Sequence, residues 1–277
     1  MTDVQRVSPA SLRDFVTDVL GRVGVPGGDA ALCADAMVWS DLRGAHGHGA
    51  SARLPVAAAR LRAGVNPSPQ WKIVSETPAM TVLDADNAWG QIAGSRGMLL
   101  AIAKARTTGI GATVVRSVDI AAALGRYPAI AVQERMIGLT ITNGMPMMAP
   151  WGSTAKLLGN QAFALGAPAA RNLPILFDSA ASAMSLRGVE AAHARGEQLP
   201  PGVAVDRENR PTTDPLAAIE GMLLPMAGYR GFGIALMWEV LTGVLAEARM
   251  APDIGGTPYG ASMFCLAIDP AIVMSSY

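Results

Sequence analysis

Apolar residues recur every three to four positions along the first part of the chain, and this spacing predicts three consecutive helices. The first can be capped by Ser8 or Ser11 and is expected to end at the glycines between residues 24 and 28. The second and third are expected over residues 29–42 and 51–62. A turn at residues 63–69, which contains two prolines, ends this helical region.

Beyond residue 70, short apolar runs alternate with longer helical segments, which is typical of a mixed α/β chain. Helices are expected to end near residue 106 and to span residues 121–134 and 232–246, and a polar, proline-rich loop is expected over residues 196–215. Strands are expected over residues 71–74, 80–83, 112–116, 137–142, 162–166, 174–177 and 262–268. We divide the chain into a helical N-terminal region, 1–70, a mixed α/β domain, 71–230, and a C-terminal helix and strand, 231–277.

The composition narrows the kind of protein. Of the 277 residues 51% are apolar, which is enough for the core of one large domain or two modest ones. The formal net charge is zero and no run of lysine or arginine occurs, which argues against a nucleic-acid or anionic-membrane surface.

The cysteines and the apolar runs indicate in which cellular compartment the protein is expected. Cys33 and Cys265 lie far apart in apolar settings, as unpaired buried thiols in a reducing compartment do, and no Cys/His spacing fits a zinc site. Charged residues interrupt the N-terminus, and the longest apolar run, 231–246, contains Glu239 and is too short to span a bilayer. We therefore expect a soluble cytoplasmic protein without a bound metal.

The stretch DLRGAHGHGASARLP, at residues 41–55, holds two of the three histidines of the chain, His46 and His48, together with Arg43 and Arg53. An imidazole that titrates near neutrality, beside an arginine that can grip a carboxylate, suits proton transfer to a small acid substrate. The same pattern also fits a glycine-rich helix terminus in which both histidines cap the helix or are solvated.

Further polar residues stand at the ends of apolar runs: Asn143, Asn160, Asp178 and Arg230. Such positions point into the crevice where ligands collect in α/β proteins, although each residue can equally form a turn or remain solvated. The chain has no G-x-G-x-x-G, no G-x-x-x-x-G-K-[ST] and no G-x-S-x-G, so the usual nucleotide and nucleophile motifs are absent from its sequence.

Seven segments of the chain resemble the type 2 malate/L-lactate dehydrogenase family, in order and with the family spacing, from residue 30 to residue 270. The first resembles the family pattern A-D-x-R-G-x-D-S-H-G-x-x-R-L-P and reads ADAMVWSDLRGAHGHGASARLP. The others are ITNGMPMMAPWGS, LLGNQAFALGAP, ILFDSAAS, GEQLPPGVAVDRENRPTTDP, LLPMAGYRGFGIALM and FCLAIDP.

This resemblance implies an enzyme class and a fold. Family members are NAD- or NADP-dependent oxidoreductases that act on 2-hydroxy or 2-oxo acids, ureidoglycolate, sulfolactate or cyclic imines, and they form homodimers or larger assemblies. Their α/β fold, with a helical N-terminal region and a mixed-sheet cofactor-binding domain, is not the Rossmann fold. By this resemblance residues 1–70 carry the catalytic histidine, 71–230 bind NADPH or NADH, and 231–277 complete the substrate domain.

The resemblance also implies individual roles. His48 matches the catalytic histidine and Arg53 the arginine for the substrate carboxylate, with Gly47 and His46 beside them at the substrate. Arg230 stands where the family usually has lysine. The residues implied in cofactor binding are Ile120, Asn143, Asn160, Asp178, Ser179, Ala180 and Arg230.

Several positions depart from the family pattern. Gly47 replaces a serine, and Arg53 lies five rather than four residues after His48. The segment that carries a second histidine in the family reads RSVDIAAALG here, so Ile120 or Asp119 takes that place. Gly188 or a neighbour stands where imine-reducing members have a relay aspartate.

These departures leave three hypotheses. The first is a reductase in which His48 is the acid/base, assisted by Asp119, and the substrate is a cyclic imine or an unusual 2-oxo acid. The second is a family member without redox activity that uses the same cavity for acid/base catalysis or binding, and the third is a purely structural subunit. The first predicts saturable binding of reduced nicotinamide cofactor, and the second predicts none, or binding without turnover.

Overall fold

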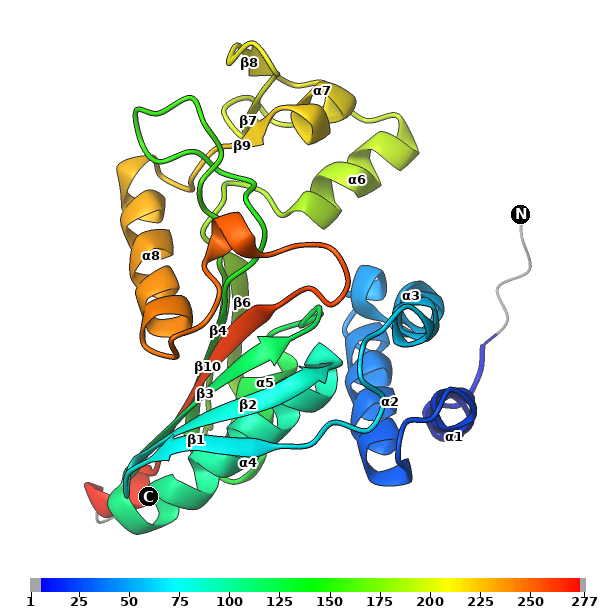
Figure 1. The fold of residues 1–277 in the computed structure, drawn as a ribbon, viewed down its shortest axis with the longest axis vertical. Coiled ribbons are helices and arrows are strands. Elements are labelled where there is room, and N and C mark those ends of the chain that lie inside the picture. Colours follow the sequence, from blue (N-terminus) through cyan, green and yellow to red (C-terminus); the bar gives the residue numbers. More distant parts are fainter. Residues whose placement is uncertain (1–5, 275–277) are drawn as a thin grey trace.

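The computed structural model describes residues 6–274. Three helices open the chain, as the spacing of apolar residues predicts: α1 (Pro9–Arg22), α2 (Gly27–Asp41) and α3 (Ala50–Arg62). The Ser8 hydroxyl caps α1 by accepting a hydrogen bond of 3.0 Å from the Ser11 amide. The three helices pack on one another through buried apolar side chains and stand together beside the sheet (Figure 1).

The centre of the protein is a seven-stranded mixed sheet with the order β1-β2-β3-β10-β4-β5-β6. Only β2 and β3 run parallel within it, and the other neighbours are antiparallel. The mixed α/β fold expected from the sequence is thereby confirmed. The strands are β1 (Lys72–Glu76), β2 (Met80–Ala88), β3 (Ile110–Val118), β4 (Ile137–Thr142), β5 (Ala162–Ala167), β6 (Ile175–Ala180) and β10 (Ala261–Ile268).

The last strand of the chain occupies the middle of this sheet. β10 pairs with β3 on one side and β4 on the other, and Cys265 faces Thr113 and Thr140 in the two registers. The strand of the expected unit 231–277 therefore belongs to the same sheet as the strands of unit 71–230.

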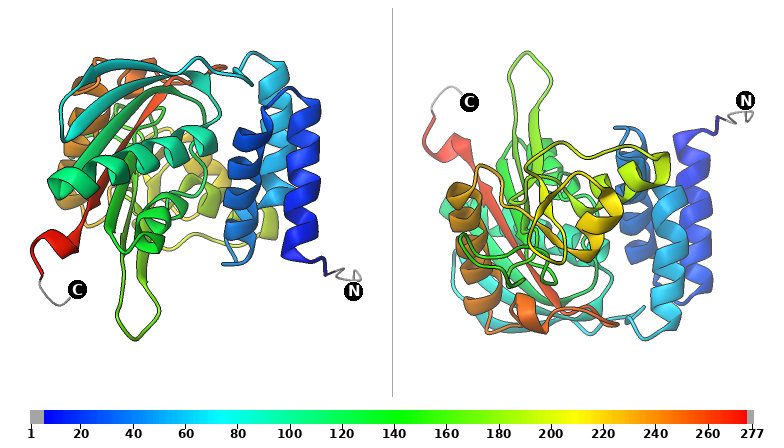
Figure 2. Two further views of the ribbon diagram at one scale, coloured as in Figure 1. Left: turned by 90° about the horizontal axis from the view of Figure 1, so that it is seen from below. Right: turned by 90° about the horizontal axis from the view of Figure 1, so that it is seen from above.

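Helices cover both faces of the sheet. α4 (Gly90–Thr108) and α5 (Arg126–Gln133) lie on one face, and α8 (Tyr229–Glu239), which continues as the π-helical turn η2 (Val240–Val244), lies on the other (Figure 2). α4 and β3 approach each other so closely at Gly97 that a Cβ there would lie only 2.7 Å from Val115 Cγ2.

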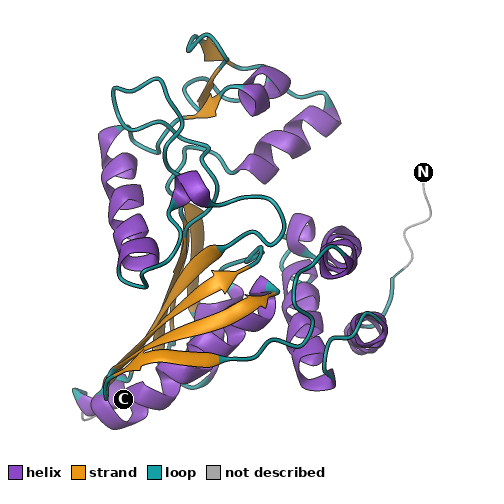
Figure 3. Cartoon of the chain, in the orientation of Figure 1, coloured by secondary structure: helices purple, strands orange, loops and turns teal. Residues whose placement is uncertain are grey.

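A small third layer lies at one end of the sheet and contains α6 (Leu186–Arg195) and α7 (Pro215–Glu220) (Figures 1 and 3). The remaining elements are the sheet β8-β7-β9, formed by β7 (Ala204–Val205), β8 (Pro211–Thr212) and β9 (Met222–Leu223), and the turns η3 (Ala251–Asp253) and η4 (Pro270–Ile272). The expected loop 196–215 is wrong in part, since it contains β7 and β8, which are too short to show an alternating pattern. Within residues 6–274 no helix has both the length and the apolar character needed to cross a membrane.

Candidate active site

A cavity of about 630 Å³ opens where the N-terminal helices, the end of the sheet and the start of α6 meet. This volume is in the range of ligand sites in enzymes. Eight of the residues expected at the site line it: His48, Arg53, Ile120, Asn143, Asn160, Asp178, Ser179 and Ala180.

His48 lies on the single turn η1 (His46–His48), between α2 and α3. The carboxylate of Asp41, at the end of α2, accepts a hydrogen bond of 2.8 Å from the Ala50 amide and so satisfies the N-terminus of α3. A Cβ at Gly49 would lie only 1.8 Å from Asp41 Oδ1, which is why a glycine is needed there. Asp41 and Gly49 together fix the turn that carries His48.

His48 is held by Arg53, whose Nη2 lies 3.0 Å from His48 Nδ1. A guanidinium can only donate, so Nδ1 must be the acceptor and the imidazole carries its proton on Nε2. Burial, followed by the charges of Arg53 and Arg187, lowers the pKa of His48 to about 4. At neutral pH His48 is therefore an uncharged imidazole with an Nε2–H donor.

Arg53 itself is 3% exposed, and its Nε has no hydrogen-bond partner within residues 6–274. Burial, followed by the charge of Arg187, lowers its pKa to about 10, so the guanidinium stays charged at neutral pH. The cavity therefore contains a buried cation with one donor left over, which suits an anionic ligand.

The loop between β3 and α5 forms one wall, through Ile120 and the residues up to Leu124. The Tyr127 hydroxyl holds this loop by donating a hydrogen bond to the Ala121 carbonyl oxygen. The helix expected over residues 121–134 therefore starts only at Arg126. Ala122 has a positive φ of 61°, which no helical residue adopts.

The opposite wall comes from the strand ends. Asp178, Ser179 and Ala180 line the cavity from β6, and the Asp178 carboxylate accepts a hydrogen bond of 2.7 Å from the Gly125 amide. Desolvation by the cavity walls raises the pKa of Asp178, against the opposing effect of that hydrogen bond.

Asn143 also reaches the cavity, but its amide is already bonded within the protein. Its Oδ1 accepts from the Ser262 amide at 2.7 Å, and its Nδ2 donates to the Arg249 carbonyl oxygen at 3.2 Å. This side chain ties the end of β4 to the segment before β10.

Four of the expected site residues lie elsewhere. Asp119 is fully buried outside the cavity and binds the Arg60 guanidinium through both oxygens, at 2.7 and 2.8 Å. Arg230 is exposed, with its guanidinium 5.4 Å from the centre of the Tyr229 ring. His46 is 73% exposed beside Asp41, and Gly47 is also exposed.

α6 also contributes to the cavity, although apart from the position of Gly188 or a neighbour no site residue was expected on it. Ser185 caps this helix by accepting a hydrogen bond of 3.1 Å from the Gly188 amide, and Ser185, Leu186 and Arg187 all line the cavity. Ser185 can be predicted from the sequence as an N-cap residue, but the direction in which the helix points cannot be predicted from it. Tyr259 also lines the cavity and accepts a hydrogen bond of 2.9 Å from the Met145 amide.

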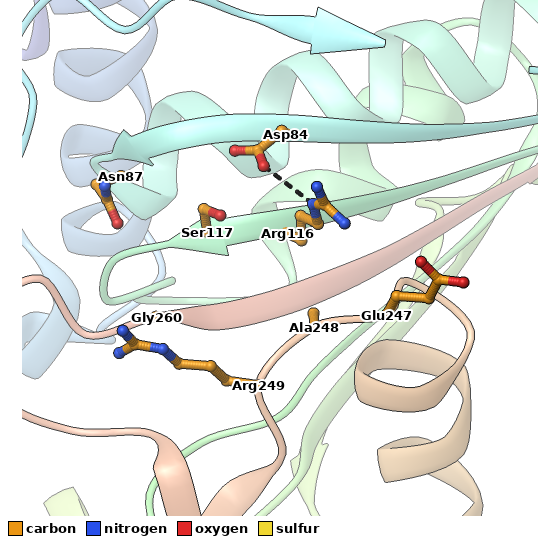
Figure 4. A pocket seen from close by; sticks show the side chains of 8 residues that line it. All are labelled: Asp84, Asn87, Arg116, Ser117, Glu247, Ala248, Arg249 and Gly260. Carbon is orange, nitrogen blue, oxygen red and sulfur yellow. Dashed lines mark hydrogen bonds and ion pairs between the residues drawn. The ribbon is translucent and has the colours of Figure 1, made fainter. Parts of the chain in front are cut away.

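A second cavity of about 380 Å³ lies among β2, β3 and the segment after η2, and none of the expected site residues lines it (Figure 4). Asp84 and Arg116 form an ion pair of 2.9 Å there, while Arg249 extends away from that pair. With Glu247, the charged side chains of this cavity comprise two arginines and two carboxylates. Their charges balance, so this cavity favours neither anions nor cations.

Comparison with known proteins gives consistent matches. Residues 7–277 match the malate/L-lactate dehydrogenase family. The chain is 37% identical to the L-sulfolactate dehydrogenase of Methanocaldococcus jannaschii over 91% of this chain and 72% of that protein. It is 32% identical to the Delta(1)-pyrroline-2-carboxylate reductase of Ancylobacter novellus, over 98% of this chain and 82% of that one.

A solved structure agrees with these matches. The malate dehydrogenase of Entamoeba histolytica superimposes with a TM-score of 0.93 at 27% sequence identity, over 98% of this chain and 80% of that one. The likeness therefore extends over nearly the whole chain rather than over one motif.

Proposed function

The chain belongs to the malate/L-lactate dehydrogenase family and is an oxidoreductase, and on that premise we propose that it interconverts a small 2-oxo acid and the corresponding 2-hydroxy acid with a nicotinamide cofactor. The observation that carries the proposal is the pair formed by His48 and Arg53 in the cavity of about 630 Å³. It combines a neutral hydrogen-bond donor, which can stabilise the negative charge that develops on the reacting oxygen, with a buried cation, which can bind the carboxylate of a 2-oxo acid.

In this proposal His48 acts through Nε2. Its Nε2–H donates a hydrogen bond to the substrate oxygen, on which negative charge develops during reduction, and the oxygen takes its proton from solvent. In the reverse direction the hydroxyl proton passes to solvent while the same hydrogen bond holds the oxygen. Arg53 keeps the proton off Nδ1 and holds the ring in place. The free Nε of Arg53 and its charge favour the carboxylate of the substrate.

The cavity also suits the cofactor. Asn160, Asp178 and Ser179 place amide, carboxylate and hydroxyl groups along one wall, which can bind sugar hydroxyls. When bound, the nicotinamide cofactor supplies or accepts the hydride. Ile120 and Ala121 contribute apolar side chains to another wall of the cavity.

A cyclic imine carboxylate is the second candidate substrate, because one relative is named as a pyrroline-2-carboxylate reductase. Two arginines line the cavity, Arg53 and Arg187, and both lower the pKa of His48. Positive charge of this kind opposes a protonated imine nitrogen. The lining therefore favours the 2-oxo acid.

Oxidation of NADH and of NADPH by purified protein, followed by absorbance with a panel of 2-oxo acids and cyclic imine carboxylates, tests the proposal. We expect turnover with a 2-oxo acid and a loss of roughly 100-fold or more in His48→Gln. His193→Gln is the matched control, because His193 lies exposed on α6 and does not line the cavity. Turnover that survives unchanged in His48→Gln would remove His48 from the chemistry.

We also propose that the protein is a cytoplasmic homodimer. Both cysteines are buried and unpaired, as expected from the sequence, and this fits a reducing compartment. Light scattering coupled to gel filtration gives the mass directly, and a monomeric mass at assay concentration contradicts the homodimer.

A further inference from the structure

We infer that Arg187 determines substrate specificity: together with Arg53 it makes the cavity select a 2-oxo or 2-hydroxy acid that carries a second acid group. The inference rests on the proposed oxidoreductase function and concerns the same cavity. Arg187 belongs to α6, far along the chain from Arg53 on α3, and the fold brings the two guanidinium groups to one cavity.

The charges of the cavity are unequal. Arg53 and Arg187 are its two cationic side chains, and Asp178 is its one carboxylate. The Asp178 carboxylate already accepts a hydrogen bond from the Gly125 amide. Glu190 pairs with Arg187 from outside the lining, so the excess positive charge of the lining itself lies around His48, and a single substrate carboxylate can satisfy only one of the two arginines.

The start of α6 adds donors to this region. The helix has 10 residues, and Ser185 caps only the Gly188 amide. The backbone amides of Leu186 and Arg187 donate no hydrogen bond to any residue between 6 and 274. Both residues line the cavity, so the positive end of the helix dipole lies at its wall and favours an anion.

A second observation also points to an anionic ligand. Arg53 is 3% exposed, lines the cavity and leaves its Nε without a hydrogen-bond partner within residues 6–274. A buried charged group with an unused donor is costly unless a ligand completes it. Two acid groups on one substrate would provide an anionic partner for Arg53 and another for Arg187.

Arg187 is available for a ligand because its present partner binds weakly. It forms an ion pair with Glu190 of the same helix, and the two side chains are 49% and 38% exposed. Exposed pairs of this kind contribute little free energy, so a substrate anion can replace Glu190 or join it. Malate and sulfolactate, for which two of the related proteins above are named, each carry a second acid group.

Two substrates of the same shape give the sharpest test: oxaloacetate, which has a second carboxylate, and 2-oxobutyrate, which has a methyl group in its place. Wild-type protein should prefer oxaloacetate by at least tenfold in kcat/KM. In Arg187→Ala, kcat/KM for oxaloacetate should fall roughly 10- to 100-fold, which corresponds to the loss of one charged hydrogen bond. The fall in kcat/KM for 2-oxobutyrate should be at least tenfold smaller. Arg187→Lys should restore part of the loss.

The matched control is Arg195→Ala. Arg195 lies on the same helix and pairs with an exposed glutamate, Glu197, but does not line the cavity, so kcat/KM should not change for either substrate. Equal losses for both substrates in Arg187→Ala, or no preference in wild-type protein, would overturn the inference.

Calorimetric binding of malonate and of propanoate separates this inference from the proposed function. If neither 2-oxo acid is turned over but malonate binds in an Arg187-dependent manner, the site for two acid groups stands and the oxidoreductase proposal fails. If 2-oxo acids are turned over and Arg187→Ala does not weaken malonate binding, the oxidoreductase proposal stands and the role of Arg187 is refuted.

Discussion

Replacing Asp119 with alanine is expected to lower the free energy of unfolding by about 3 kcal/mol. The Asp119 side chain is fully buried, and both of its oxygens accept hydrogen bonds from Arg60, whose side chain is 19% exposed. This pair fixes the N-terminal helices against the loop after β3. Its removal leaves a largely buried guanidinium with one remaining bond, of 2.7 Å, to the Gly256 carbonyl oxygen.

The magnitude follows from that geometry. Removal of one partner of a buried pair typically costs about 3–5 kcal/mol. The low end applies here because Arg60 keeps its bond to Gly256 and reaches some solvent. In a chain of this size about 1 kcal/mol shifts the melting temperature by roughly 2–4 °C, so Asp119→Ala should melt about 6–12 °C below wild type.

Urea and thermal unfolding of Asp119→Ala, Arg60→Met and the double variant provide the assay. The double variant should lose clearly less than the sum of the single losses, since the two groups act as one pair. Asp18→Ala is the control: its pair with Arg22 is exposed, 59% for Asp18 and 76% for Arg22, and the change should stay below about 0.5 kcal/mol.

One outcome would refute this reasoning. If Asp119→Ala unfolds like wild type but has lost turnover, Asp119 assists catalysis as the sequence suggests and the ion pair contributes nothing to the fold.

Two further predictions concern the turn that carries His48. Gly49→Ala should lower both the melting temperature and kcat/KM, because the new Cβ would lie 1.8 Å from Asp41 Oδ1. Gly47→Ala is the control, since no atom lies within 4 Å of a Cβ at Gly47. Equal melting temperatures and kcat/KM values for the two variants would contradict this prediction. The second prediction concerns pH: burial lowers the pKa of His48 from 6.5 to about 4, so its contribution to stability is present above pH 6.5 and lost as the pH falls to 4. Wild type should lose melting temperature relative to His48→Gln across that window, and a constant difference would count against a buried neutral histidine.

The fold could be predicted from the sequence where one local signal dominates. The limits of β4 coincide with the expected strand 137–142, because a short apolar run there begins soon after Arg135 and is followed by Asn143. The residues just before α5 show where such reasoning fails. The run from Ala121 to Leu124 has high helix propensity, but the bond from Tyr127 and the ion pair of Asp119 hold it as a loop.

The candidate site shows the same division. His48 and Arg53 could be found because they lie five residues apart in one motif, on a turn and the helix that follows it. Arg187 could not, since with Glu190 three residues later it has the pattern of a solvated helix pair. Only the burial of Val189 and Ala192 of α6 in one apolar cluster with Met148 and Ala181 brings Arg187 to the cavity.

Fluorescence titration of the protein with NADH and NADPH is the measurement that decides whether the cavity binds a nicotinamide cofactor. We expect saturable binding of at least one of the two cofactors, retained in His48→Gln and weakened in Asp178→Ala, because Asp178 lines the cavity. Folded wild-type protein that binds neither cofactor at millimolar concentration would contradict the account.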